Sequence, residues 1–316
     1  MPVSSNSSRR KLLVASATYK RNELLDGLLK SLRDVQIPDG VDVEFLIIDN
    51  ETSGGARPVV EKWQSQFEVP LHYEIEEAPG VTHVRNRALA AAAEFDFLAF
   101  IDDDEFASPE WLVALVERYD ARPSAAVFGP VQSVYSAIAP EWIRDWGVHG
   151  TPMETDEDQT KPGATCNCLI EMKTVSELSL TFEPRMSLLG GEDTLFFTRM
   201  LDAGRRLTRA KDALVYEHVP DSRANSRWLM RRWYRTGISD ALIAGRNVSP
   251  FLSRLRALFH GVARVVVGAV LVALVWLVTL GRNPRKVLER CYTVCRGAGM
   301  ISFATGRMYE EYGRAS

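Results

Sequence analysis

The sequence predicts an α/β protein built on a parallel sheet, followed by a basic C-terminal part with one long apolar segment. Through the first half, short apolar runs alternate with amphipathic segments, which is typical of buried parallel strands connected by helices. Residues 1–220 hold 22 basic and 36 acidic side chains, whereas residues 221–316 hold 16 and 5. The uncharged run Val265–Leu280 lies within the basic part.

The expected strands are short apolar runs between polar or turn residues, at residues 12–15, 45–48, 71–75, 97–101, 125–128 and 214–216. Leucines near 3.6 spacing after a capping Asn22 predict the first helix. Ser108 and Pro109 are typical of a helix start, and Gly204 of a helix end. The expected helices cover residues 22–32, 58–67, 84–94, from 109 onward, 193–203 and 226–237. Residues 133–161 are expected to form a loop-rich connection.

Length and composition exclude several classes of protein. A chain of 316 residues allows one large domain or two small ones, and 46% hydrophobic with 25% charged residues excludes disordered, collagen-like and disulfide-stapled proteins. The four cysteines are expected to be reduced. The Ser-rich segment Met1–Lys11 has no apolar stretch behind it, so we expect no signal peptide and a cytosolic first domain.

The apolar run near the C-terminal end predicts membrane association. It extends from Val262 to Leu280, with Arg264 as its charged residue. A spanning helix needs about 20 apolar residues, which requires counting Leu258 and Phe259 and letting Arg264 extend to the headgroups. Basic flanks favour the cytoplasmic side. Because both flanks of this run are basic, a helix that spans the membrane would place one basic flank on the far side. The segment therefore either spans, or is re-entrant or interfacial with both flanks inside, and we favour the second.

Polar motifs follow the expected strands, where ligands of open α/β sheets bind. No Gly-x-Gly-x-x-Gly and no Walker lysine follows the first strand, which argues against a dinucleotide-binding domain. Asp49, after the second strand, either accepts hydrogen bonds from a base or ribose, or forms a turn or helix cap. The run Asp102–Glu105 favours Mg²⁺ or Mn²⁺ bound together with substrate phosphates. Its alternative is a solvated acidic turn.

Two further motifs lie at expected helix starts. Gly190 and Gly191 allow close approach of the backbone to a ligand. Glu192 and Asp193 follow them, and these acids either cap a helix or provide a general base. Arg85, with a second arginine two residues on, either binds phosphate or lies on the surface.

In chain order, these motifs resemble those of a known family. They are Ala17-Thr-Tyr-Lys-Arg21, Ile48-Asp49-Asn50, Gly80 with Arg85-Asn86, Asp102-x-Asp104 and Gly190-Gly-Glu-Asp193. From about residue 10 to 237, the chain resembles family 2 inverting glycosyltransferases, most of all bacterial enzymes of succinoglycan and exopolysaccharide biosynthesis. The resemblance implies the GT-A fold, a Rossmann-like mixed α/β sheet, here with a C-terminal helical, membrane-associated extension. It also implies metal-dependent, inverting transfer from a nucleotide-sugar, first of all a UDP-sugar.

The resemblance implies a role for each matching residue. Asp193 would be the catalytic base, supported by Glu192. The donor nucleotide would be bound by Thr18, Asp49, Arg85, Asn86, Asp102 and Asp103. A divalent cation, Mn²⁺ or Mg²⁺, would be held by Asp104 and Asp102 of the DXD motif, and His218 would be a further ligand or a structural histidine. The sugar and acceptor region would include Thr165, Asn167, Gly190 and Gly191.

The expected organisation follows from these assignments. It comprises a disordered N-terminus (1–10), the GT-A catalytic domain (11–220), a basic helical connector (221–257), a membrane-associated helix (258–281) and a basic tail (282–316). The expected acceptor is a lipid-linked or saccharide precursor, the expected location is the inner membrane with the catalytic domain facing the cytoplasm, and no nucleic-acid partner is expected. Leu229 replaces the glutamine of the Gln-x-x-Arg-Trp element of processive members, so processive synthesis is not expected.

Three other functions stay open. A nucleotidyltransferase would need a Gly-rich, Lys-containing loop after the first strand. A phosphohydrolase with an aspartate nucleophile would also use Asp102-x-Asp104, and would release free phosphate without an acceptor. A catalytically silent membrane scaffold is disfavoured because Asp102, Asp104 and Asp193 are all present.

Overall fold

The computed structural model describes residues 9–187 and 190–306, which form two compact units. The first combines residues 9–134, 149–184 and 193–218. The second combines residues 135–148, 185–187 with 190–192, and 219–306. Most of the N-terminal segment 1–10 lies outside the described residues, and Arg10 already begins the first strand.

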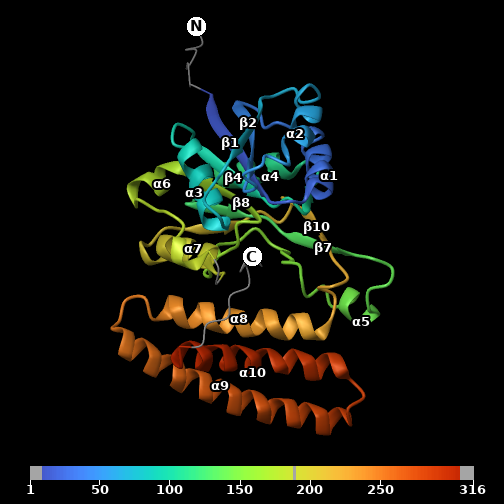
Figure 1. Ribbon diagram of the computed structural model, residues 1–316, viewed down its shortest axis with the longest axis vertical. Helices are drawn as coiled ribbons and strands as arrows, with labels where there is room; N and C mark the ends of the chain where they lie inside the picture. The colour runs from blue at the N-terminus through green and yellow to red at the C-terminus, as the bar shows by residue number, and fades with distance from the viewer. Residues whose placement is uncertain (1–8, 188–189, 307–316) are drawn as a thin grey trace. The chain divides into compact units, whose positions relative to one another are not determined.

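A seven-stranded sheet lies at the centre of the first unit (Figure 1). Its strands are β1 (Arg10–Thr18), β2 (Val41–Asp49), β3 (Leu71–Ile75), β4 (Phe97–Ile101), β6 (Ala126–Phe128), β8 (Asn167–Glu171) and β9 (Leu207–Arg209). They follow the order β3-β2-β1-β4-β8-β6-β9. The strands β3, β2, β1 and β4 are parallel, whereas β8 runs antiparallel to β4 and β6. The sheet is therefore mixed rather than wholly parallel.

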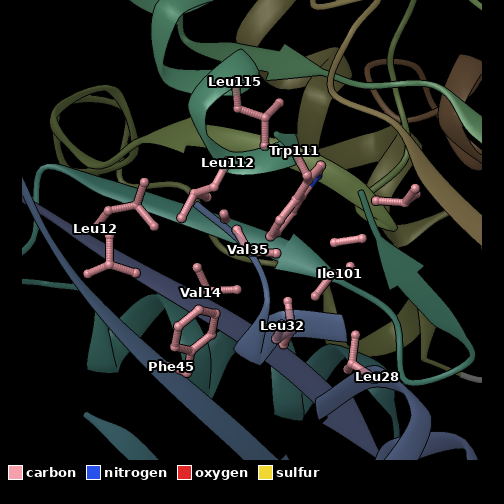
Figure 2. Close-up of a cluster of buried hydrophobic side chains, with 14 of the residues drawn as sticks. Leu12, Val14, Leu28, Leu32, Val35, Phe45, Ile101, Trp111, Leu112 and Leu115 are labelled. Atoms are coloured by element: carbon pink, nitrogen blue, oxygen red, sulfur yellow. The ribbon is translucent and has the colours of Figure 1, made fainter. Parts of the chain in front are cut away.

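The central parts of β1, β2 and β4 are apolar because both faces of the sheet are covered there. Successive residues of a strand point to opposite faces. Leu12 and Val14 accordingly belong to one apolar cluster, and Leu13 and Ala15 to another. Figure 2 shows the first cluster, in which side chains of β1, β2 and β4 meet helices on that face: Leu12, Val14, Phe45, Ile101, Leu28, Leu32, Trp111, Leu112 and Leu115.

The helices of the first unit largely match the prediction. They are α1 (Asn22–Arg33), α2 (Arg57–Gln64), α3 (Val81–Ala91), α4 (Trp111–Ala121), α6 (Met172–Glu177) and α7 (Glu192–Asp202). Two predicted caps are wrong: Arg21 occupies the N-cap of α1, and Glu110 that of α4. Asn22 instead donates to the Gly55 carbonyl over 2.9 Å. Gly204, with a φ of 73°, follows α7 as predicted.

A small second sheet adds three strands, β5 (Glu105–Ala107), β7 (Val131–Tyr135) and β10 (Val215–Val219), in the order β5-β10-β7. Within it β10 runs antiparallel to β5, with Glu217 opposite Glu105. This pairing brings a segment more than 100 residues away in sequence next to the acidic run after β4.

The second unit is mainly helical, with α5 (Glu141–Arg144), the short helix Pro184–Met186 at its border, α8 (Ser226–Ala244), α9 (Pro250–Thr279) and α10 (Pro284–Ala304). Figure 1 shows α10 between α8 and α9. The apolar helix begins at Pro250 rather than at residue 258, and the expected basic tail contains α10. Among the described residues, α9 is the one helix long and apolar enough to cross a membrane by length and composition.

All four cysteines are free, as predicted.

The apolar cluster of Figure 2 should dominate the stability of the first unit. Leu28 has no exposed surface, so Leu28→Ala is expected to lower the free energy of unfolding by about 3 kcal/mol. Urea denaturation followed by circular dichroism measures the loss. Ile37→Ala is the control, because Ile37 is 36% exposed and surface changes cost about 0.5 kcal/mol or less. Equal losses for the two variants would contradict this assignment of the core.

Candidate active site

The site is built around four consecutive carboxylates, Asp102 to Glu105, at the carboxyl end of β4. Asp103 and Glu105 are 4% and 2% exposed. Burial raises the pKa of Asp102 to about 7, and the charges of Asp104 and Asp103 act in the same direction. Burial, followed by the charge of Asp102, also raises the pKa of Glu105 well above its ordinary value. Because Asp103 and Glu105 are buried, a solvated acidic turn does not describe this run.

Two residues from the end of β1 compensate part of this charge. The Thr18 hydroxyl donates to Asp103 Oδ2 over 2.8 Å. Arg21 Nη1 lies 3.0 Å from Asp103 Oδ1 and 3.2 Å from Asp104 Oδ2. Contact of Thr18 with the nucleotide stays a prediction, and the pairing of Arg21 with the acidic run was not predicted from the sequence. A basic residue just beyond β1 was the available signal, because β1 and β4 are neighbours in the sheet.

Asp49 organises the loop after β2. Its Oδ1 accepts from the Glu51 N–H over 2.8 Å, and its Oδ2 accepts from the Ala56 N–H over 3.0 Å and from the Tyr73 hydroxyl over 2.8 Å. It has no exposed surface. Asp49 therefore stabilises a turn, which is the second of its two predicted roles. Its contact with a base stays a prediction.

Arg85 and Asn86 lie on the first turns of α3, behind Gly80 with its φ of 116°. Asn86 pairs with the backbone of Phe182 through two hydrogen bonds of 2.8 Å. The guanidinium of Arg85, which is 8% exposed, lies 5.7 Å from the centre of the Phe182 ring. Phe182 in turn stacks on Phe196 of α7 at 4.3 Å. This chain of contacts connects α3 to the helix that carries Asp193.

The segment before and within β8 lies beside the acidic run, because Asn167 is opposite Ile101 in the sheet. Asn167 Nδ2 donates to the carbonyls of Pro130 and Ala213 over 2.9 and 2.8 Å, and its Oδ1 accepts from Trp111 Nε1 over 2.8 Å. Its side chain thus cross-links three segments. The Thr165 hydroxyl is buried without a hydrogen-bond partner among the described residues. Contact of either residue with a sugar stays a prediction.

The Gly190–Gly191 turn belongs to the second unit. Both glycines have positive φ, 74° and 88°. A Cβ on Gly191 would lie 2.8 Å from Ser239 Cβ, and the Ser239 hydroxyl donates to the Gly190 carbonyl over 2.9 Å. The close packing of this turn against α8 therefore explains glycine at position 191. Approach of the turn to a ligand stays a prediction. Glu192, which follows it, is 7% exposed.

Asp193 lies at the start of α7 and is half-buried. The N–H and the hydroxyl of Thr194 both donate to its Oδ1, over 2.6 and 3.3 Å. This geometry fits both alternatives for Asp193. An acid at a helix start is favoured by the helix dipole, as a helix cap would be, and a half-buried side chain can still meet a substrate, as a general base must.

Two thiols show which groups converge. Burial raises the pKa of Cys168, and the charges of Asp102 and Asp193 raise it further while Arg85 opposes them. Burial also raises the pKa of Cys166, and Glu105, Asp102 and Asp193 add to this. Arg85, Asp102 and Asp193 come from three separate motifs, yet all act on Cys168. The electrostatic environment of Cys168 thus includes charged groups from all three motifs.

His218 is brought to the acidic run by β10. Its backbone N–H donates to the Asp104 carbonyl over 3.3 Å. Its exposed imidazole lies 4.9 Å from the ring of Phe106. The structure thus places His218 beside Asp104, and leaves its ring accessible.

Whether these residues suit a divalent cation can be judged from their chemistry. Within residues 9–187 and 190–306, no group of three or more His, Cys, Asp and Glu side chains is arranged to hold a metal ion. The run Asp102–Glu105 nevertheless offers only carboxylate oxygen atoms, and Asp103 and Glu105 within it are buried. Mg²⁺ and Mn²⁺ sites with one or two carboxylates are usually completed by substrate phosphates and water. The residues fit a cation that binds together with a diphosphate.

The roles of Asn167 and Thr165 can be separated by stability. Asn167→Leu leaves two carbonyls and the Trp111 N–H without their partner, and each buried unpaired group costs about 1–3 kcal/mol. We expect the free energy of unfolding to fall by about 3 kcal/mol or more in urea titrations. Thr165→Val loses no hydrogen bond and should cost less than about 1 kcal/mol. A stable Asn167→Leu protein would show that the cross-link is unimportant.

Comparison with known proteins identifies a family model and a curated relative. The family model described as "Glycosyl transferase family 2" matches residues 14–175. A curated relative, the succinoglycan biosynthesis protein ExoM of Rhizobium meliloti (strain 1021), is 34% identical over 224 residues, which are 71% of this chain and 72% of ExoM.

Solved structures share the fold at lower identity. TarS 1–349 of S. aureus in complex with UDP-GlcNAc has a TM-score of 0.55 and 18% identity, over 95% of this chain and 93% of that one. The mannosyltransferase PcManGT from Pyrobaculum calidifontis, in complex with GDP-Man and Mn²⁺, has a TM-score of 0.61 and 18% identity, over 95% and 88%. In a longer TarS structure the chain spans 44% of the length, with a TM-score of 0.53. The matched family model and the identity to ExoM show that this chain belongs to the family 2 glycosyltransferases, and its mixed sheet is their GT-A fold.

Proposed function

We propose that this glycosyltransferase moves a sugar from a nucleotide-diphosphate sugar to an acceptor hydroxyl, with inversion at the anomeric carbon. The observation that carries the proposal is the set of contacts at the carboxyl end of β4, where Thr18 donates to Asp103 and Arg21 pairs with Asp103 and Asp104. Phe182, which contacts both Arg85 and Phe196, connects Arg85 to the helix that carries Asp193. A cationic group for a diphosphate, a carboxylate for a cation or ribose, and a second carboxylate for a base are the groups that such a transfer needs. The nucleotide-sugar complexes of TarS and PcManGT support a donor of this class.

In the proposed reaction, Asp193 is the general base. Its carboxylate takes the proton of the acceptor hydroxyl while the hydroxyl oxygen attacks the anomeric carbon. The bond from that carbon to the diphosphate oxygen breaks, and the nucleoside diphosphate leaves. A single displacement needs one base, which accords with one Glu192–Asp193 pair. Glu192, which is buried next to Asp193 in the chain, supports its position.

Arg85 and Arg21 are the proposed partners of the donor diphosphate. Arg85 is nearly buried and close enough to Asp102 to oppose the rise of its pKa. Arg21 lies at the border of the acidic run, with its side chain 41% exposed. Fixed cations near the breaking bond stabilise the negative charge that develops on the leaving group. Thr18, Asp49, Asn86 and Asp103 are proposed to shape the nucleotide site around them.

A divalent cation, Mn²⁺ or Mg²⁺, is proposed to be held by Asp104 and Asp102, with His218 as a further ligand. When bound, such an ion neutralises charge on the diphosphate. Asp104 would then exchange its ion pair with Arg21 for the cation, and Arg21 would pair with the phosphates instead. The Mn²⁺ in the PcManGT structure supports a cation in this fold.

The acceptor is proposed to be a lipid-linked or saccharide precursor of a cell-envelope or secreted polysaccharide. The likeness to ExoM supports this class of pathway. Thr165, Gly190 and Gly191 are the proposed residues on the sugar and acceptor side. We also propose attachment of the chain to the inner membrane through α9, with the catalytic unit on the cytoplasmic side.

Asp193→Asn tests the base. The amide cannot accept the proton, so we expect transfer to fall at least 100-fold, within the range typical of general bases. Donor affinity, measured by calorimetry, should stay within about twofold, because Asp193 touches the acceptor rather than the nucleotide. Asp202→Asn, at the other end of the same helix, is the matched control and should keep full activity. Turnover of Asp193→Asn within tenfold of the unaltered enzyme would remove Asp193 from this role.

Asp104→Ala tests the cation site. In calorimetric titrations of a panel of nucleotide sugars with and without Mn²⁺, we expect the metal-dependent part of donor binding to disappear. Asp212→Ala is the control, because that side chain is 73% exposed and pairs only locally with Lys211 in the described part of the chain. An unchanged response to Mn²⁺ in Asp104→Ala would refute the ligand assignment. Release of free phosphate without any acceptor would favour a phosphohydrolase.

A further inference from the structure

The outward face of α9 is apolar along most of its length. Six large side chains lie three or four residues apart, so they share one face of the helix. Their exposed fractions run from 46% to 72%, for Leu255, Phe259, Val262, Val266, Val270 and Leu274. We call these six residues the outer stripe. Monomeric soluble proteins rarely expose a continuous apolar surface of this length, so the outer stripe needs a covering partner.

The opposite face of α9 is bound to α10 by small residues. Ser253, Ala257, Gly261 and Gly268 are the buried positions of α9. A Cβ on Gly261 would lie 2.8 Å from the Gly297 carbonyl oxygen, and a Cβ on Gly297 would lie 2.7 Å from the Gly261 carbonyl oxygen. The two backbones are therefore in contact, and α9 cannot move away from α10 without losing this packing.

The other side of α10 is bound to α8 in the same way. A Cβ on Gly237 would collide with the Arg296 carbonyl, and one on Gly299 with the Tyr234 carbonyl. Arg296 also forms an ion pair with Asp240 of α8. The helix α10 is thus the middle layer of this unit and α9 an outer layer, as Figure 1 shows.

This layering is incompatible with α9 as a membrane-spanning helix. Its uncharged part, Val265–Leu280, has 16 residues, which rise about 24 Å, so a helix that crossed the roughly 30 Å hydrocarbon core would have to carry Arg264 with it. If α9 crossed the bilayer, α10 would have to cross beside it, because their glycines are in contact. That would carry the five charged side chains of α10 into hydrocarbon, namely Arg285, Lys286, Glu289, Arg290 and Arg296. Charged side chains there are costly.

Both ends of α9 instead carry residues that suit the headgroup region. Arg254 and Arg256 lie in its first turns, and Arg282 follows its end. Trp276, which is 55% exposed near that end, is of the type enriched at membrane interfaces. Basic residues at both ends match an anionic lipid surface, and they fit a helix that lies parallel to it.

We infer that α9 and α10 bind a membrane from one side only, with α9 in the plane of one leaflet and the outer stripe among the acyl chains of anionic phospholipids. Neither helix crosses, and both ends of α9 stay on the same side. This inference rests on the membrane attachment in the proposed function, but not on the transfer reaction. It identifies the interfacial arrangement, among those that the sequence left open, as the one that the packing requires.

Impermeant maleimide labelling tests the topology in the full chain with its four cysteines replaced by serine. Asn247→Cys and Arg282→Cys place one exposed thiol beyond each end of α9. In sealed inside-out inner-membrane vesicles, both are expected to react before detergent is added. Reaction of Arg282→Cys only after detergent would overturn the inference. If both positions required detergent, one-sided binding would stand and the cytoplasmic location in the proposed function would fail.

Vesicle flotation tests the outer stripe. The triple variant Phe259→Glu, Val266→Glu, Val270→Glu changes only exposed positions, and it should reduce flotation with phosphatidylglycerol-containing vesicles at least tenfold while donor binding persists. Ile138→Glu is the matched control, because Ile138 is 81% exposed in the same unit but not on α9. Unchanged flotation of the triple variant would overturn the inference. The inference would also be overturned if the unaltered chain formed a dimer in the absence of vesicles and the triple variant were a monomer. The partner of the outer stripe would then be a second copy of the chain.

Discussion

Four carboxylates in a row at the end of a buried strand are the constraint around which the first unit is organised. Charge that is removed from water must be compensated by hydrogen bonds or opposite charge. Thr18, Arg21 and Arg85 approach the cluster from two other motifs and supply part of this compensation. Burial, together with the charges of Asp104 and Asp103, still raises the pKa of Asp102 to about 7, although Arg85 opposes this rise. A cation and a diphosphate would complete it from outside the chain.

Several polar residues near this cluster use their side chains to hold the scaffold together. Asp49 caps its own loop, Asn86 holds Phe182, and Asn167 cross-links three segments. Each uses its hydrogen bonds within the protein, so each keeps the strand ends and the α3–α7 contact in place. This division leaves the half-buried Asp193 and the accessible ring of His218 as groups that can meet a substrate or an ion without dismantling the fold.

In the second unit, small residues determine how the helices pack. Glycines on α8, α9 and α10 let three helix backbones approach closely. The charged helix α10 is then held between two neighbours, and the apolar side of α9 is turned outward. The acidic first part and the basic last part of the sequence correspond to the two proposed tasks, which are the binding of a cation with a nucleotide and attachment to an anionic lipid surface.

The sequence by itself determined the long elements and the family, because both depend on local patterns. Apolar runs predict β1 to β4, leucine spacing predicts α1, and ordered motifs after the strands indicate the glycosyltransferase family. The tertiary structure alone decided the antiparallel insertion of β8 between β4 and β6, the ion pair of Arg21 with Asp103 and Asp104, and the partners of Asn167. These contacts join residues 37 to 83 positions apart, and no local pattern records such a pairing. The helix α10 resembled a basic tail for the same reason, since its glycines have a purpose only when α8 and α9 lie against them.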